Sequence, residues 1–115
     1  MTADYAARIA RGTVWVDMAG ELRGFVVFHP DGSDMLLETV ATHPDHVGRG
    51  IGLALIAFCE AEARRRGSRA VRLYTNAAMA RNLTLYPRLG YALDGRREED
   101  GFARVFFRKD LAQTP

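Results

Sequence analysis

The stretch Thr42–Gly67, "THPDHVGRGIGLALIAFCEAEARRRG", places three glycines within five positions at the head of a long amphipathic run. From Gly50 to Arg66, apolar residues recur at three- and four-residue steps, which predicts a helix with one buried face. The first N–H groups of a helix have no partner within it, and glycine leaves them open to an approaching ligand. The stretch therefore predicts an anion site where a strand passes into a helix.

Two familiar phosphate-binding loops fit this stretch poorly. A P-loop requires Lys-Ser or Lys-Thr after its last glycine, whereas Gly52 is followed by Leu53. A dinucleotide-binding loop has the spacing Gly-x-Gly-x-x-Gly and an acidic residue about 20 positions later. Here the spacing is Gly-x-Gly-x-Gly, and Arg69 and Arg72 occupy the later region. A nucleotide-binding protein is thus a weak alternative.

The segments around the glycine loop predict a single α/β domain over residues 1–115, because the chain is too short for two cores. Alternation and turn residues predict a mainly antiparallel mixed sheet flanked by helices, with one strand–helix–strand unit embedded in it. Pro87 is expected to kink its helix or to end the regular part early. The expected strands are Thr13–Asp17, Leu22–His29, Met35–Thr42, Ala70–Thr75, Tyr91–Arg96 and Ala103–Lys109, and the further helices are Asp4–Arg11 and Ala77–Leu89.

Composition excludes several classes of protein. The formal net charge of +2 is too small for a nucleic-acid-binding surface, and no apolar run reaches the roughly 20 residues that would span a membrane. The lone Cys59 cannot form an internal disulfide, and no leader segment precedes the domain, so a cytoplasmic location is expected. No cluster of ligand residues suggests a metal site.

Two segments, in matching order, resemble the GNAT family of N-acetyltransferases. The family's acetyl-coenzyme A loop is similar to Val40–Asp45 followed by Gly48–Gly52. A later helix of the family, which has an Asn followed by the pattern Leu-Tyr-x-x-Leu-Gly, is similar to "MARNLTLYPRLGY", Met79 to Tyr91. The closing "DGFARVFFRK" resembles the last hairpin of small bacterial members, so the likeness extends over Trp15–Lys109. The resemblance implies a GNAT-like acyl-CoA N-acyltransferase fold.

The resemblance also implies a function and a set of site residues. The expected activity is transfer of an acetyl group from acetyl-CoA to a primary amine of a small molecule or protein. Tyr86 matches the family tyrosine that protonates the coenzyme A sulfur; Glu38 is the first candidate base and His46 the second. The residues expected to bind acetyl-CoA are Val40, Ala41, Thr42, Val47, Gly48, Arg49, Gly50, Ile51, Gly52, Leu53, Asn76, Asn82 and Tyr86.

Other readings of the same residues stay open. Glycines in such a loop can be purely structural, Tyr86 can be a core residue, and Glu38 can belong to a solvated face. The chain opens at what resembles the family's second helix, so the fold is expected to be N-terminally shortened. Strand Thr13–Asp17 is then expected to be a bare edge, which pairs with a second copy of the chain in a homodimer or with a strand-completing partner. The alternatives are a catalytically weak coenzyme A-binding or regulatory module and a pure interaction domain.

Overall fold

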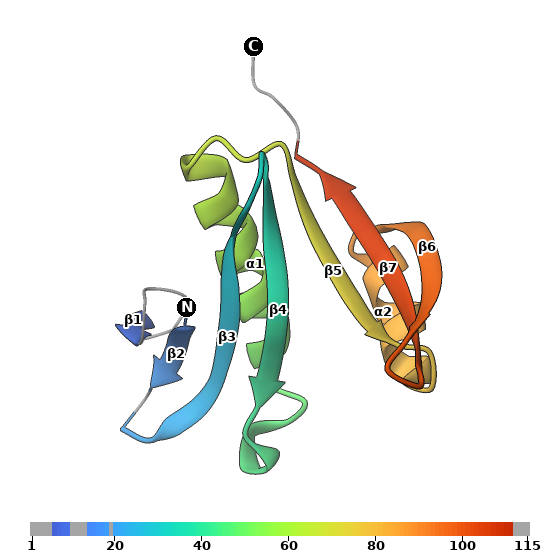
Figure 1. The fold of residues 1–115 in the computed structure, drawn as a ribbon. Coiled ribbons are helices and arrows are strands. Elements are labelled where there is room, and N and C mark those ends of the chain that lie inside the picture. The colour runs from blue at the N-terminus through green and yellow to red at the C-terminus, as the bar shows by residue number, and fades with distance from the viewer. Residues whose placement is uncertain (1–5, 10–13, 19, 112–115) are drawn as a thin grey trace.

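The computed structural model describes residues 6–9, 14–18 and 20–111, which contain one mixed sheet with two helices. The strands lie in the order β1-β2-β3-β4-β5-β7-β6, and neighbours are antiparallel except β4 and β5 (Figure 1). The elements are β1 (Ala6–Ile9), β2 (Val14–Met18), β3 (Leu22–Asp31), β4 (Asp34–Thr42), a 3₁₀ turn (Pro44–His46), α1 (Ile51–Arg65), β5 (Ala70–Asn76), α2 (Ala80–Arg88), β6 (Ala92–Glu99) and β7 (Phe102–Asp110).

The predicted fold class is confirmed, including the strand–helix–strand unit that β4, α1 and β5 form. The helix expected over Asp4–Arg11 is wrong where the structure describes it, because residues 6–9 are strand β1; the other residues of that range lie outside the described ones. Helix α2 begins at Ala80 rather than Ala77, and it ends at Arg88, one residue after Pro87. The proline thus lies in the last turn, and the helix ends one residue before the expected Leu89.

The expected bare edge at Thr13–Asp17 is also wrong. Strand β1 pairs with β2 in antiparallel register, so that Ile9 lies opposite Val14, and β2 is an inner strand. Trp15 packs against Phe28 and Phe58, with ring centroids 6.0 and 5.2 Å away. The expectation of a homodimer or strand-completing partner therefore loses the reason that was given for it.

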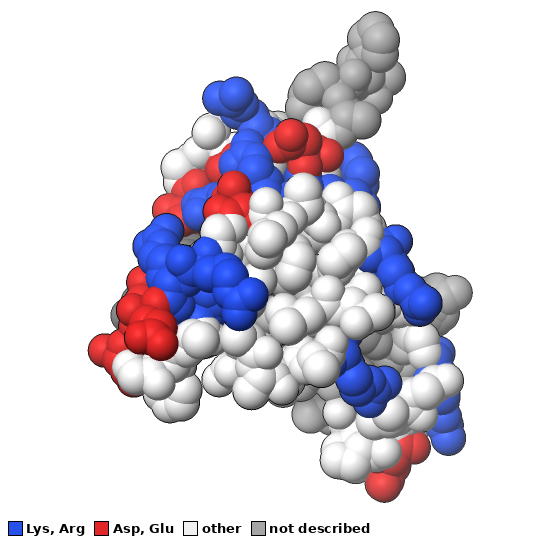
Figure 2. Space-filling model, turned by 90° about the vertical axis from the view of Figure 1, so that its right-hand side faces the viewer, with Lys and Arg blue, Asp and Glu red and all other residues white. Residues whose placement is uncertain are grey.

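Among the described strands, β6 lies at the other end of the sheet order, with β7 as its neighbour. The side of the molecule formed by β6, β7 and α2 is uncharged in its middle and carries basic and acidic side chains toward its borders (Figure 2). Leu93 of β6 is 64% exposed. Charged residues in the second half of β6 are of the kind that discourages pairing between sheet edges.

Both helices cover the same face of the sheet (Figure 1). Helix α1 buries Ile51, Leu55, Ile56 and Cys59, the face predicted from its periodicity, against β3 and β4. The core residues of the sheet alternate with half-buried ones, so that the inner face of each strand meets the helices. No helix among the described residues is long and apolar enough to cross a bilayer.

Gly24 of β3 lets α1 approach the sheet closely. A β-carbon built on Gly24 would lie 2.7 Å from the carbonyl oxygen of Ala41 and 3.1 Å from a methyl carbon of Ile51. A backbone atom at that distance cannot move aside without shifting β4 itself. The sequence therefore needs a residue without a side chain where β3, β4 and the first turn of α1 meet.

We expect Gly24→Ala to destabilise the fold by about 1–3 kcal/mol, because the added methyl group overpacks this junction. Thermal unfolding followed by circular dichroism measures the effect. The matched control is Gly52→Ala, whose β-carbon meets only the Thr42 hydroxyl at 3.4 Å and whose helical position favours alanine. A Gly24→Ala protein as stable as the wild type would contradict the close approach.

Candidate functional site

The site lies where β4 and β5 stop pairing. Their parallel ladder has three residue pairs, which join Met35–Leu37 to Val71–Leu73. Beyond Leu37 the strands diverge, as Figure 1 shows. Among the described residues, the second half of β4 is paired on its β3 side only. Its other edge offers backbone N–H and C=O groups to whatever occupies the gap.

A bulge in β4 lies at the head of this gap. Thr39 pairs with Val27, but the next pair along is Leu37 with Phe28, so Glu38 is an extra residue without a partner. Bulges bend a strand and redirect side chains, and they are frequent next to active sites. The bulge thus accounts for the divergence of β4 at this point and places Glu38 at the mouth of the gap.

The loop after β4 ends at the N-terminus of α1 with its amides open. Among the described residues, none of the backbone N–H groups of residues 48–53 donates to an acceptor. Gly48 and Gly50 have φ angles of 88° and 78°, a conformation that favours glycine, and a β-carbon on either would meet nothing within 4 Å. These open amides and the positive end of the helix dipole suit the anion site that the sequence predicts.

Arg49 and His46 form a supporting network beside the loop. An Arg49 Nη1 group donates to His46 Nδ1 at 2.9 Å, and His46 Nε2 lies 2.6 Å from Glu21 Oε2. Because guanidinium groups only donate, His46 Nδ1 accepts and Nε2 carries the proton that bonds Glu21. His46, the second candidate base, is buried in this network and lines neither of the two cavities described below.

A cavity of about 510 Å³ begins at the glycine loop and runs between α1 and α2. From the loop side it is lined by backbone and apolar groups, and from the α2 side by Arg81 and Asn82. The sequence-predicted residues that line it are Val40, Thr42, Val47, Gly48, Gly50, Ile51, Gly52, Leu53, Asn82 and Tyr86. The cavity thus brings together most of the residues predicted to bind acetyl-CoA.

A second cavity of about 460 Å³ lies in the gap between β4 and β5. It includes Glu38 and Asn76, and it shares Val40, Asn82 and Tyr86 with the first cavity. Because these residues border both spaces, the two cavities form one path from the open amides to the bulge. Ala41 and Arg49 line neither cavity, although both were predicted as binding residues.

Tyr86 lies where the two cavities meet. Its ring packs against those of Tyr91 and Phe107, each with a centroid 5.8 Å away. Burial raises the pKa of the Tyr86 phenol above its usual value, so the hydroxyl keeps its proton well beyond neutral pH. Tyr86 thus belongs to the core and also borders both cavities, and its role as a proton donor stays a prediction.

The two asparagines hold the turn between β5 and α2. Asn76 Oδ1 accepts a hydrogen bond from the Ala78 N–H at 2.8 Å, and Asn82 Nδ2 donates to Thr75 Oγ1 at 3.0 Å. These bonds fix the start of α2 against the end of β5. Both asparagines also border a cavity, Asn76 the second and Asn82 both.

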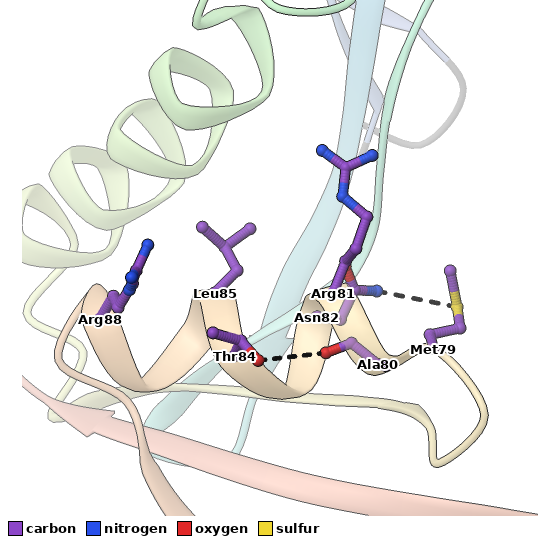
Figure 3. Close-up of a pocket in the computed structure, with 7 residues that line it drawn as sticks. All are labelled: Met79, Ala80, Arg81, Asn82, Thr84, Leu85 and Arg88. Carbon is purple, nitrogen blue, oxygen red and sulfur yellow. Dashed lines mark hydrogen bonds between the residues drawn. The ribbon is translucent and has the colours of Figure 1, made fainter.

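A groove of about 810 Å³ continues along α2 beyond the first cavity. Figure 3 shows Arg81, Leu85 and Arg88 rising from the side of α2 that faces α1. The groove and the first cavity share Met79, Arg81, Asn82 and Leu85, so the path extends along the helix. Two guanidinium groups with an apolar side chain between them suit a ligand with both anionic and flat apolar parts.

Sequence analysis missed several residues of the site. Arg81 lies inside the quoted segment Met79–Tyr91, and its helical spacing from Leu85 and Arg88 was the available signal. Tyr74 lines the second cavity from β5, and Phe102 and Arg104 reach it because β7 pairs with β5. The described residues contain no group of His, Cys, Asp and Glu side chains arranged for a metal.

Comparisons with known proteins agree on one family. Residues 2–91 match the model of the acetyltransferase (GNAT) family. The nourseothricin acetyltransferase structure is 27% identical with a TM-score of 0.74; the alignment covers 84% of this chain, which spans 62% of that protein's length. The comparison with curated proteins found no match.

Two further crystal structures share the fold. The ribosomal-protein-S18-alanine N-acetyltransferase of Escherichia coli is 19% identical with a TM-score of 0.78, and the alignment covers 99% of this chain and 74% of that one. A GNAT family acetyltransferase of Elizabethkingia anophelis, with acetyl-CoA bound, is 16% identical with a TM-score of 0.78, over 85% of this chain and 75% of that one.

Proposed function

Because the chain belongs to the acetyltransferase (GNAT) family, we propose that it transfers an acetyl group from acetyl-CoA to a primary amine. One observation carries the proposal: two adjoining cavities, which share Tyr86, extend from the open amides of residues 48–53 to the unpaired edge of β4, and we infer one path through them. This path has an anion site at one end and a proton donor toward the other. Acetyl-CoA suits that arrangement, because its diphosphate and its acetyl thioester lie at opposite ends of the long pantetheine arm.

The chain's own groups divide the binding of acetyl-CoA between them. The amides of residues 48–53 and the Arg81 guanidinium, which line the first cavity from α1 and α2, bind the diphosphate. The free backbone edge of Thr39–Thr42 pairs with the pantetheine arm and directs the acetyl group into the gap. Arg88, farther along α2, is placed to meet the nucleotide end.

Acetyl transfer requires a neutral amine and a proton for the departing thiolate. An alkylammonium group with a pKa near 10.4 loses its proton at pH 7 at a cost of about 4.6 kcal/mol. Glu38, at the mouth of the gap, is the proposed base that accepts this proton, directly or through water. The amine attacks the thioester carbonyl directly, and Tyr86 donates its phenolic proton to the sulfur as the C–S bond breaks.

Gly50→Glu should abolish acetyl-CoA binding. A carboxylate about 4 Å from a phosphate near the surface is repelled by about 4 kcal/mol, on the order of 1000-fold in Kd. Isothermal titration calorimetry with acetyl-CoA measures the affinity. Gly67→Glu is the matched control, because its φ angle of 78° is the same but it lies beyond the far end of α1. Unchanged affinity in Gly50→Glu would rule out the loop as the diphosphate site.

Tyr86→Phe should slow turnover by about 100-fold or more while acetyl-CoA affinity stays near the wild-type value, because only the proton donor is lost. Release of the coenzyme A thiol with a panel of primary amines gives the rate. Because burial raises the pKa of the Tyr86 phenol above its usual value, wild-type activity should show no loss from this group near neutral pH, and the loss should come at a higher pH than for an exposed tyrosine.

The matched control for Tyr86→Phe is Tyr91→Phe. Tyr91 is also buried, and its hydroxyl donates to Glu60 Oε2 at 2.8 Å rather than facing either cavity. Its removal should change stability but leave turnover per folded molecule near the wild-type rate. Equal turnover in Tyr86→Phe and the wild type would remove Tyr86 from the mechanism.

A further inference from the structure

The second cavity carries one acidic and one basic side chain among the described residues that line it. Glu38 comes from β4 on one side of the gap, and Arg104 comes from β7 on the other. All other residues that line this cavity are uncharged. A molecule that enters the gap toward Tyr86 therefore meets a carboxylate and a guanidinium on strands that lie on opposite sides of the gap.

Arg104 is held in place by its neighbours. Its guanidinium lies over the ring of Tyr74, 4.8 Å from the centroid, and its Nη1 donates to Glu99 Oε1 at 3.1 Å. Tyr74 alternates with the buried Leu73 and Thr75, so Arg104 and Tyr74 lie on the sheet face that the helices leave uncovered. The stacked position limits the rotamers of Arg104. Only Nη1 bonds Glu99, so the other N–H groups of the guanidinium can donate to a ligand.

Arg104 shares its carboxylate partner with a second arginine. Arg97 lies directly opposite Arg104 in the β6–β7 register, and its Nη1 is 3.6 Å from the other oxygen of Glu99. One carboxylate thus serves two guanidinium groups. The cluster of Arg97, Glu99 and Arg104 itself has a formal charge of +1, which favours an incoming anion at Arg104.

Glu38 supplies the opposite charge. Its side chain is 43% exposed, and one oxygen lies 3.2 Å from His29 Nε2. Since Glu38 belongs to the bulge at the mouth of the gap, it can hold an ammonium group before that group loses its proton. A polycation would place its second ammonium near Arg104 with no further acid in the lining to receive it.

We propose, on the basis of the proposed function, that the acceptor is a primary amine that also carries a carboxylate, of the free amino acid type. Glu38 binds the amine. Arg104 binds the carboxylate through two parallel N–H···O hydrogen bonds, because the spacing of guanidinium N–H groups matches that of the carboxylate oxygens. Arg104 is then the residue that selects the acceptor. It takes no part in the proton transfers.

The test compares each amino acid of a panel with two analogues that lack the carboxylate, its decarboxylated amine and its amide. The amine of the first analogue is more basic than that of the amino acid and the amine of the second is less basic, so the pair separates carboxylate recognition from amine pKa. We expect kcat/KM, measured by thiol release, to be about 10- to 100-fold higher for at least one amino acid than for both analogues, the range for a charged hydrogen bond.

Arg104→Gln should lower kcat/KM for the amino acid to within about threefold of the kcat/KM of its analogues. The change should come from a higher KM rather than from a lower kcat. Arg108→Gln is the matched control, because Arg108 lies four residues along the same strand, pairs with Asp34 and Asp110, and lines neither cavity. It should keep the full preference. A preference that survives in Arg104→Gln, or that is absent in the wild type, overturns the inference.

Glu99→Gln tests the same point without removing Arg104, in case Arg104→Gln fails to fold. It frees the guanidinium, so the preference for the carboxylate should be kept or increased, and a lost preference would contradict the proposal. Calorimetric titration of the amino acid and its analogues into the protein–coenzyme A complex separates this inference from the proposed function. If no amine is acetylated, the proposed function fails. Binding of the amino acid in preference to its analogues supports the inference about the acceptor, and equal or absent binding of the amino acid overturns it.

Discussion

The early end of the β4–β5 ladder is the constraint on which the site depends. Three pairs join the strands, and the bulge at Glu38 then turns β4 away, so that backbone groups which a regular sheet would pair are left free. Unpaired backbone groups away from water are costly, and a ligand that forms hydrogen bonds with them recovers that free energy. The same divergence opens the space in which Tyr86 and Glu38 border one path.

The predictable parts of the structure are those whose signal is local. The apolar stripe of α1 and the glycines before it identify the helix and its open N-terminus, because both depend on spacing within a few residues. Residues 6–9 carry alanine and isoleucine, which fit either a helix or a strand, and pairing with β2 decides between them. The distinction lies in the tertiary contact, so the sequence pattern could not supply it.

The acceptor side of the gap shows the same limit more sharply. Arg104 reaches the cavity because β7 pairs with β5, which places it opposite Asn76 and over Tyr74. Those partners are separated from it by about 30 positions in the sequence, and nothing near Arg104 in the chain distinguishes it from Arg108. Residues that strand register brings to the cavity are thus not predictable from local motifs, although they form part of its lining.

Because β4 and β5 diverge, the two sides of the sheet need a further contact that holds them together. The buried carboxylate of Glu60 provides one. Glu60 projects from α1, accepts the hydroxyl of Tyr91 at 2.8 Å, and pairs with Lys109 of β7 at 3.1 Å. The Tyr91 N–H donates to the Tyr86 carbonyl at 3.0 Å, which ties the end of α2 to the same cluster. Because a buried charge is tolerated only when paired, this cluster fixes α1, α2 and β7 relative to one another. The packing of α1 and α2 beside the gap is therefore stabilised by a contact outside the gap itself, and this contact keeps the Glu60–Lys109 pair even without the Tyr91 hydroxyl.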